Sequence, residues 1–463
     1  MNQEKAIALS FDSGTIIVDH LQGEPLELLK SLLSYDERVR TYRALAMNYA
    51  KIVMALHRAK IPFVDAAKAY EKQSFSMKSG MIPREHQNAA FEAWRKVNSR
   101  GMVVLPTGAG KSFLAYMGIQ YCQRPSLIMV PTIDLMHQWN RGLSETFGIE
   151  VGMLGGGEKN IQPITVSTYD SALLMMEWLG DRFGLLVFDE CHHLPGDRMR
   201  QAALMSLAPF RLGLTATPER SHTGLSEYGG LTGPLCFRME IGELKGDILS
   251  PYETCRIELD LDEDEEFLYH EERQIYLDFL KLCGISFKNG DGWARFIMAC
   301  ARSDEGRRAL KAFYAQKKIA NCGRAKFRQL WQIFRDHSGE RIIIFTADND
   351  TAYAIGRRFL LPVLTHHTKS AERKKMLDRF RSGQHPILAT SKVLNEGVDV
   401  PEASVGIVVS GSGSTREHVQ RLGRILRKSE GKQAVLYELI SRNTSEFNVS
   451  ERRRQHSAYE GSR

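Results

Sequence analysis

Two series of short apolar runs, separated by amphipathic segments, constrain the fold of this 463-residue chain more than any other feature. The first series comprises residues 101–105, 126–130, 164–167, 185–188 and 211–214, and the second comprises residues 341–345, 386–389, 406–409 and 434–437. Continuous apolar strands with helices between them are typical of parallel sheets covered on both faces. We therefore predict an α/β protein with two parallel-sheet lobes, at residues 81–258 and 326–445.

Residues 1–75 have a different pattern, which predicts a small α+β domain. Residues 7–11 and 14–18 are typical of two strands joined by a turn. One buried helix face is then predicted by apolar residues at helical spacing, namely Tyr42, Leu45, Tyr49, Ile52, Val53 and Leu56. The polar segment 73–80 contains glycine and predicts a linker to the first lobe.

A change in charge marks the segment between the lobes, residues 259–325. Residues 260–272 contain eight acidic side chains and no lysine or arginine, whereas residues 288–328 contain eleven basic and three acidic ones. Helices are predicted over 265–282 and 307–320. The segment is either a solvated helical surface or a protruding helical element whose basic face touches phosphates. The composition of residues 446–463 predicts a basic, disordered tail.

Composition excludes several classes of protein. The 62 basic and 55 acidic residues give a net charge of +7, which is compatible with a nucleic-acid partner but too small to indicate one alone. The sequence has no apolar run of membrane-spanning length and no signal sequence. The seven cysteines are scattered without a Cys-x-x-Cys pair, which argues against a disulfide framework, a zinc finger or an iron–sulfur cluster. We expect a cytoplasmic protein.

A phosphate-binding loop is predicted at residues 105–112, between a strand and an apolar helix. Gly108 and Gly110 let the backbone wrap around phosphate oxygens, Lys111 adds a charge near the β- and γ-phosphates, and Ser112 can ligate Mg²⁺. The generic motif has glycine at position 105, where this chain has leucine. Candidate nucleotide-binding residues are therefore Pro106, Thr107, Gly108, Ala109, Gly110, Lys111 and Ser112.

A second nucleotide-site signal is the apolar run that ends in Asp189 and Glu190. Two carboxylates at a strand end suit Mg²⁺ coordination by Asp189 and polarisation of the attacking water by Glu190. The alternatives are an ordinary strand-end turn and, for Cys191 and the two following histidines, a zinc site. Contiguous ligands cannot easily face one ion, which argues against zinc.

Two further segments could complete the nucleotide site. Arg84 and Gln87 precede the first lobe, and the Gln87 amide offers both a donor and an acceptor to adenine. In the second lobe Gln420 opens a segment in which Arg424 and Arg427 would lie on one helix face. Such arginines can stabilise charge on a γ-phosphate in the transition state, and a solvated basic helix is the alternative.

In order and content these motifs resemble superfamily 2 helicases, and in particular the XPB branch of DNA repair and transcription helicases. Matches to helicase motifs Ia, Ib, III, IV and V are found at residues 131–135, 168–172, 214–218, 343–346 and 390–399. Longer stretches similar to compact archaeal and bacterial XPB proteins are residues 208–217, 411–427 and 435–442. The similarity spans nearly the whole chain.

This resemblance implies two RecA-like lobes, a damage-recognition domain at residues 1–72 and a thumb insertion between the lobes. It implies ATP and Mg²⁺ as cofactors, 3′-to-5′ unwinding of DNA, and a partner nuclease in some archaea. Motif V would add Gly397 and Asp399 to the nucleotide site, and motif III would couple hydrolysis to DNA through Thr215 and Thr217. Backbone contacts to DNA, with little sequence preference, are expected near Thr132, Thr168, Thr346 and Thr390.

One departure from the family weakens the prediction of strand separation. The family has an Arg-Glu-Asp element after motif III, where this chain has Arg220, Ser221 and His222. Our main hypothesis is an ATP-dependent DNA helicase or translocase. An RNA helicase, and a non-unwinding remodeller or scaffold for a nuclease, remain alternatives. The sequence also leaves open whether the N-terminal domain senses damage or only packs on the lobes.

Overall fold

The computed structural model describes residues 6–78, 80–194, 196–216, 229–239, 252–287, 291–391, 403–411, 434–447 and 450. Contacts between residues divide the chain into two units, residues 1–240 with 396–399, and residues 241–395 with 400–463. The two units are described separately below. In the part of the chain that is described, no helix has the length and apolar character needed to span a membrane.

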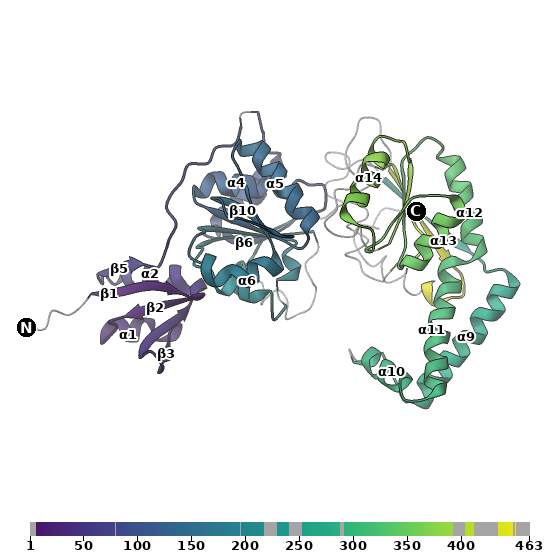
Figure 1. Ribbon diagram of the computed structural model, residues 1–463, viewed down its shortest axis with the longest axis horizontal. Helices are drawn as coiled ribbons and strands as arrows, with labels where there is room; N and C mark the ends of the chain where they lie inside the picture. Colours follow the sequence, from purple (N-terminus) through teal and green to yellow (C-terminus); the bar gives the residue numbers. More distant parts are fainter. Residues whose placement is uncertain are drawn as a thin grey trace, which may run out of the picture. The chain divides into compact units, whose positions relative to one another are not determined.

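The N-terminal domain is a five-stranded sheet with two helices (Figure 1). Its strand order is β3-β4-β2-β1-β5, and only the β1–β5 pair is parallel. The elements are β1 (Ile7–Asp12), β2 (Thr15–Asp19), α1 (Glu24–Leu29), β3 (Ser34–Asp36), β4 (Thr41–Leu45), α2 (Tyr49–Arg58) and β5 (Phe63–Ala66). The predicted hairpin is confirmed, with Gly14 in its turn at φ 78°.

The predicted helix from Tyr42 to Leu56 is wrong in its first part. Tyr42 and Leu45 lie in β4, which pairs with β2 and β3, and helix α2 begins at Tyr49. Apolar residues spaced three apart can belong to one continuous helix or to a short strand followed by a helix, so this spacing alone does not distinguish the two. Sheet pairing with two neighbours overrides the local pattern here.

The N-terminal domain shares its core with the first lobe. Leu207 of the lobe belongs to the same buried cluster as Leu9, Ile16 and Ile52. The Met205 side chain lies so close to Gly14 that a Cβ at that glycine would be 2.6 Å from Met205 Cγ. Packing on the lobe is therefore a structural role of this domain.

The first lobe contains an eight-stranded sheet of order β13-β6-β12-β11-β7-β10-β8-β9, parallel except for β9. Its strands are β6 (Arg100–Val104), β7 (Ser126–Val130), β8 (Gly152–Gly155), β9 (Glu158–Asn160), β10 (Ile164–Thr168), β11 (Leu185–Asp189), β12 (Phe210–Thr215) and β13 (Leu235–Arg238). Its helices are α3 (Glu85–Lys96), α4 (Lys111–Cys122), α5 (Ile133–Phe147), α6 (Tyr169–Leu179) and α7 (Arg200–Leu204). Figure 1 shows α4 and α5 on one side of the sheet and α6 on the other. All five predicted strands are confirmed.

The predicted linker 73–80 runs along the first lobe. The backbone N–H of Gln73 donates to the Gln123 carbonyl at 2.9 Å, and that of Phe75 donates to the Gln123 side chain at 2.8 Å. The Phe75 ring is buried and meets Phe147 edge to face. Residues 73–78 are thus fixed to the lobe that they precede.

The second lobe contains a six-stranded, fully parallel sheet of order β14-β19-β18-β15-β17-β16. Its strands are β14 (Tyr252–Leu259), β15 (Ile342–Phe345), β16 (Val363–Leu364), β17 (Ile387–Thr390), β18 (Val405–Val408) and β19 (Ala434–Ser441). Helices α12 (Arg324–Asp336) and α13 (Asn349–Phe359) pack on this sheet, and α14 (Ser370–Arg381) precedes β17. The mixed α/β architecture with two parallel-sheet lobes confirms the predicted fold class.

Two predicted boundaries need correction. Residues 252–258 were assigned to the first lobe, but β14 pairs along its whole length with β19 of the second sheet. The predicted tail begins too early, because Glu446 is buried and forms a 2.7 Å ion pair with the buried Lys326. Residues 451–463, which the tail prediction also covers, lie outside the described residues.

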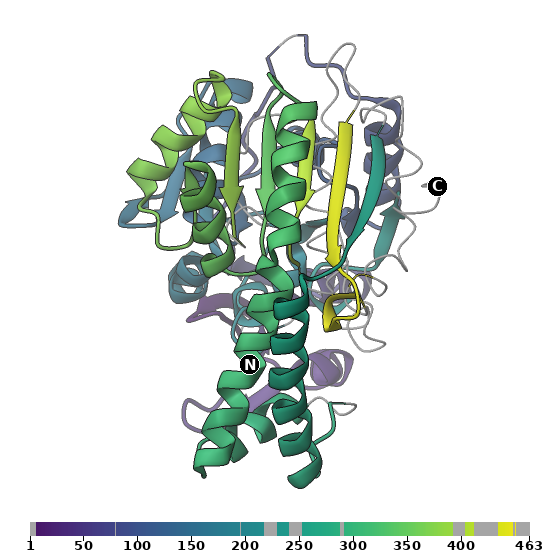
Figure 2. The same cartoon turned by 90° about the vertical axis from the view of Figure 1, so that its right-hand side faces the viewer.

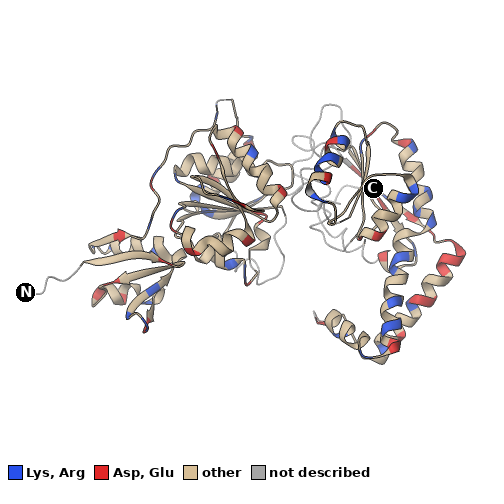
Figure 3. Cartoon of the chain, in the orientation of Figure 1, with Lys and Arg blue, Asp and Glu red and all other residues tan. Residues whose placement is uncertain are grey.

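The thumb-like insertion is a pair of long helices that extend from the second sheet (Figure 2). It consists of α9 (Glu263–Leu282), α10 (Gly292–Cys300) and α11 (Asp304–Cys322). In Figure 3 the ribbon is coloured for acidic residues along α9 and for basic residues along α11 and α12. Several of these charges pair with each other, for example Arg308 with Glu272 and Arg328 with Asp262.

Replacing Glu446 tests whether the C-terminal segment belongs to the lobe. In Glu446→Ala the buried Lys326 ammonium loses its counter-ion, and we expect a loss of about 3 to 5 kcal/mol of stability in the second lobe. Hydrogen exchange of the β19 amides measures this loss. As a control, Glu27→Ala breaks an exposed pair with Lys30 and should cost less than about 1 kcal/mol. Unchanged exchange in Glu446→Ala would contradict the assignment.

Candidate active site

The predicted phosphate-binding loop connects β6 to the N-terminus of α4. Gly108 and Gly110 have φ angles of 88° and 83°, which only glycine adopts without strain. A Cβ at Gly110 would lie 2.3 Å from Gln87 Nε2, so a side chain there would displace the Gln87 amide. Helix α4 begins at Lys111, and the free backbone N–H groups of its first turn suit an anion. The loop therefore has the backbone geometry that a phosphate chain requires.

Three predicted catalytic residues of the first lobe lie together at the carboxyl edge of its sheet. Lys111 Nζ donates to the Leu105 carbonyl at 3.3 Å and lies 3.9 Å from Glu190 Oε1. Asp189 is the last residue of β11, and Glu190 follows it in a left-handed conformation with φ 46°. The structure thus brings Lys111 and the two carboxylates into one charged cluster.

The Asp189 carboxylate is held at both oxygens. Trp139 Nε1 donates to Oδ2 at 2.8 Å, and the Glu190 backbone N–H donates to Oδ1 at 3.0 Å. Burial, and then the nearby Glu190 charge, raise the pKa of Asp189 to about 6, although Lys111 acts in the opposite direction. The buried Asp189 carboxylate and the partly buried Glu190 carboxylate beside one ammonium leave a negative site, which fits a divalent cation. Ser112, the second residue of α4, is the other predicted ligand.

A short 3₁₀ turn after Glu190 (Cys191–His193) connects this cluster to the end of β12. His192 Nδ1 lies 3.5 Å from Glu190 Oε2 and 3.1 Å from the Thr215 hydroxyl. Cys191 is buried in the core of the lobe, where burial raises the pKa of its thiol. Among the residues that the structure describes, no three His, Cys, Asp or Glu side chains are grouped to hold a metal ion.

Gln87 is placed differently from the prediction that it reads adenine. Its side-chain oxygen accepts the Arg84 backbone N–H at 2.8 Å, and its amide group donates to the Gly110 carbonyl at 3.2 Å. The neighbouring His86 Nε2 lies 2.8 Å from the Ala109 carbonyl. In this structure the start of α3 therefore supports the phosphate-binding loop, and Arg84 is its N-cap residue.

Two predicted nucleic-acid contacts of the first lobe cap neighbouring helices. Thr132 caps α5 and Thr168 caps α6, and each hydroxyl accepts a backbone N–H at 3.3 Å. These helices follow β7 and β10, which are adjacent parallel strands, so both N-termini lie at the edge that carries Asp189. The turn after β8 packs against them, since a Cβ at Gly155 would lie 3.0 Å from the Thr168 hydroxyl.

The contacts with nucleic acid that are predicted near Thr346 and Thr390 stay a prediction. Both side chains are fully buried. The Thr346 hydroxyl donates to the Asp348 carbonyl at 2.8 Å, and the Thr390 hydroxyl donates to the Ser391 carbonyl at 3.0 Å. They stabilise the strand ends from inside, so any contact at this edge must come from neighbouring groups.

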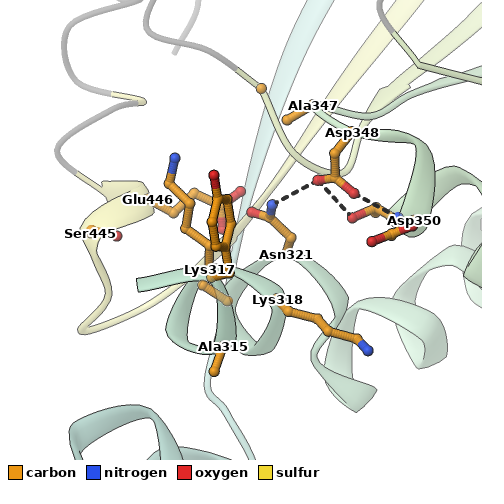
Figure 4. A pocket seen from close by; sticks show the side chains of 13 residues that line it. Ala315, Lys317, Lys318, Asn321, Ala347, Asp348, Asp350, Ser445 and Glu446 are labelled. Carbon is orange, nitrogen blue, oxygen red and sulfur yellow. Dashed lines mark hydrogen bonds between the residues drawn. The ribbon is translucent and has the colours of Figure 1, made fainter. Parts of the chain in front are cut away.

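A pocket of about 640 Å³ lies beside Thr346, between the thumb base and the carboxyl edge of the second sheet (Figure 4). Helix α11 contributes Lys317, Lys318 and Asn321, and the strand ends contribute Asp348 and Gly411. Asn321 Nδ2 donates to Asp348 Oδ2 at 3.2 Å, which joins the thumb to the lobe. Among the described residues that line this pocket, the two lysines are the basic ones.

The remaining predicted site residues lie outside the described residues. They are Gln420, Arg424 and Arg427 of the arginine-containing segment, Gly397 and Asp399 of motif V, Thr217 of motif III, and Ser221 and His222.

Sequence reasoning missed Trp139, Tyr169, His86 and His192. Trp139 and the Tyr169 hydroxyl bond to Asp189, which is 50 and 20 residues away in the chain. No local pattern marks such partners. His86 is next to Gln87 in the sequence. The only sequence signal for the contact of His192 with Thr215 is that His192 follows the carboxylate pair Asp189 and Glu190.

The raised pKa of Asp189 makes stability depend on pH. Its folded-state pKa of about 6 exceeds the ordinary 3.8, so the folded protein binds the proton more tightly and loses stability as pH rises through this window. The loss reaches about 2 to 3 kcal/mol above pH 6. In metal-free and nucleotide-free protein, the stability of Asp189→Asn relative to the parent should therefore increase from about pH 4 to pH 7.

Melting temperatures of both proteins in EDTA across this range measure the difference. Asp304→Asn changes an exposed carboxylate and serves as a control with no such trend. A difference between Asp189→Asn and the parent that is constant with pH would contradict the burial argument.

Three family models match consecutive parts of the chain. The model described as the Xeroderma pigmentosum group B helicase damage recognition domain matches residues 9–67. The model of the type III restriction enzyme res subunit matches residues 80–220, and that of the ERCC3/RAD25/XPB C-terminal helicase matches residues 307–461.

Curated relatives and a solved structure agree with these matches. The DNA 3′-5′ translocase XPB2 of Sulfurisphaera tokodaii is 37% identical over 91% of this chain and 96% of its own length. The DNA 3′-5′ helicase XPB of Mycobacterium tuberculosis is 28% identical over 82% of this chain and 64% of its own length. The Pyrococcus furiosus Hef helicase domain shares the fold at a TM-score of 0.53 and 19% identity, covering 81% of this chain and 98% of that one. The chain therefore belongs to the XPB family of DNA helicases and translocases.

Proposed function

We propose that this protein is an ATP-dependent 3′-5′ DNA translocase or helicase of the XPB type that acts in DNA repair. The observation that carries this function is the shared carboxyl edge of the first sheet. Lys111, Asp189 and Glu190 lie there together with the N-termini of α5 and α6. A nucleotide site and a nucleic-acid backbone site on one edge allow hydrolysis at one to affect binding at the other.

The first lobe would bind the nucleotide through the glycine loop and Lys111. Glu190 lies close enough to the Lys111 ammonium group to interact with its charge. The contact with His192 orients the Glu190 carboxylate toward the end of β12. We assign Glu190 to orientation of the attacking water. Asp189 and Ser112 would hold Mg²⁺, which neutralises phosphate charge when bound. Gln420, Arg424 and Arg427 of the second lobe would stabilise the γ-phosphate.

DNA would contact the first lobe at the N-termini of α5 and α6, where backbone N–H groups and helix dipoles favour phosphates. In the second lobe Lys317 and Lys318 are the candidate phosphate contacts in place of the buried threonines. These groups touch the backbone and not the bases, so we expect little sequence preference.

Two alternatives concern the substrate and the outcome of hydrolysis. The core motifs also allow RNA, and ATPase stimulation by DNA and RNA strands of equal length separates these possibilities. Ser221 and His222 replace two acids of the strand-separating element, which favours translocation without unwinding or a scaffold for a nuclease partner. A forked-duplex unwinding assay, with and without added nuclease, tests that alternative.

Replacing Lys111 tests the nucleotide site. Lys111→Ala removes the charge that meets the phosphates and should lower DNA-stimulated ATP hydrolysis by about a hundredfold or more. Steady-state phosphate release with saturating single-stranded DNA measures it. Lys96→Gln, an exposed lysine at the end of α3, is the matched control and should hydrolyse ATP normally. Near-parental turnover by Lys111→Ala would show that the site assignment is wrong.

Replacing Lys317 and Lys318 tests the second-lobe contact. The double variant Lys317→Gln with Lys318→Gln should weaken binding of DNA of any sequence and reduce the slope of log affinity against log salt by about one to two. Fluorescence anisotropy at several salt concentrations measures the slope. Lys96→Gln again serves as control, and an unchanged slope would remove these lysines from the interface.

A further inference from the structure

Trp139 connects three functional segments of the first lobe. Its indole N–H donates to Asp189 Oδ2 at 2.8 Å. Its ring meets Tyr116 of α4, the helix of the phosphate-binding loop, edge to face at 6.0 Å. It belongs to α5, which begins at the predicted DNA contact. With only 3% of its surface exposed, Trp139 has a packed and well-defined position.

Thr132 and Trp139 lie on one face of α5. They are seven residues apart, which is close to two helical turns and about 10 Å along the axis. The N-terminus of α5 and the Asp189 carboxylate are therefore connected by two turns of rigid helix and one hydrogen bond. A small shift of α5 on binding a phosphate would move the donor that holds Asp189.

Tyr169 provides a second connection of the same kind. It is the first residue of α6, directly after Thr168, and its hydroxyl donates to the Asp189 backbone carbonyl at 2.8 Å. Each of the two helices that face nucleic acid thus sends one buried donor to the same residue. The two donors hold Asp189 at its side chain and at its backbone.

We propose that Trp139, assisted by Tyr169, is a positioning residue that transmits DNA binding at α5 and α6 to the carboxylate of Asp189. This proposal rests on the proposed function, because it requires both an ATPase site and a DNA site in this lobe. Before DNA binds, the donor holds the carboxylate in its resting position. When phosphates engage the helix N-termini, Trp139 and Tyr169 move with their helices and reposition Asp189 for hydrolysis.

Trp139→Phe tests the proposal, because it keeps a ring against Tyr116 and removes the N–H. We expect the stimulation by DNA, which is the ratio of DNA-bound to DNA-free ATP hydrolysis, to fall at least about fivefold. A second readout needs no turnover. Coupling between the two binding affinities is reciprocal, so the change in single-stranded DNA affinity caused by a non-hydrolysable ATP analogue should shrink by the same factor as the change in analogue affinity caused by DNA. Fluorescence anisotropy measures that affinity.

Trp94→Phe is the matched control. Trp94 is also a buried tryptophan of this lobe, and its indole N–H donates at 2.8 Å to a carbonyl of the same sheet, that of Arg211 on β12. Any effect of simply losing a buried indole donor should appear in both variants, whereas loss of coupling should appear only in Trp139→Phe. Tyr169→Phe should change coupling in the same direction, and it keeps the test available if Trp139→Phe does not fold.

Three outcomes would overturn the proposal. They are parental stimulation in both Trp139→Phe and Tyr169→Phe, equal loss of DNA-free and DNA-stimulated hydrolysis in these variants, and equal loss of coupling in Trp94→Phe. If DNA does not stimulate ATP hydrolysis by the parent protein, that result overturns the proposed function instead.

Discussion

The structure of the first lobe depends on placing two carboxylates and one ammonium group together at a sheet edge with little access to water. Asp189 and Glu190 reach this edge because β11 is central in the sheet, with β7 and β12 on either side. Lys111 reaches it because the glycine loop turns the chain directly into α4. Burial and the neighbouring Glu190 charge raise the pKa of Asp189, because the single Lys111 ammonium does not neutralise both carboxylates. Such a site gains most from a cation and a phosphate chain.

Much of this arrangement could be predicted from the sequence. Buried parallel strands are continuous apolar runs, and the phosphate loop and the carboxylate pair are local signals that follow such runs. The predictions failed where the deciding partner is distant in sequence. Strand β14 pairs with β19, nearly two hundred residues later, and nothing within 252–259 indicates which sheet it joins. Glu446 is buried because it meets Lys326, so a polar tail pattern concealed a structural residue.

The residues of the candidate site also divide into those that a local sequence pattern predicts and those that depend on partners distant in the chain. The capping by Thr132 and Thr168 has a local pattern, a threonine between a strand and a helix, whereas their predicted contacts with nucleic acid come from the helicase resemblance. The burial of Thr346 and Thr390 depends on the pairing of neighbouring strand ends, since the Thr346 backbone N–H donates to the Thr390 carbonyl at 2.9 Å. Trp139 looks in the sequence like an ordinary core residue of an amphipathic helix. The hydrogen bond from its indole N–H to Asp189, and not its hydrophobic surface, distinguishes Trp139 from an ordinary core residue.

Many charges of the thumb pair with each other, and the alternative in which its basic face touches phosphates stays a proposal. Much of the acidic run at the start of α9 is paired with the basic side of the thumb base, since Arg324 contacts Asp262, Asp264 and Glu265. Exposed pairs of this kind contribute little stability, but a cluster of them restricts the angle at which two helices leave a lobe. Lys317 and Lys318 lie beyond this cluster, at the pocket beside β15. The acidic residues therefore orient the arm, and Lys317 and Lys318 lie at the pocket where we propose a contact with a phosphate backbone.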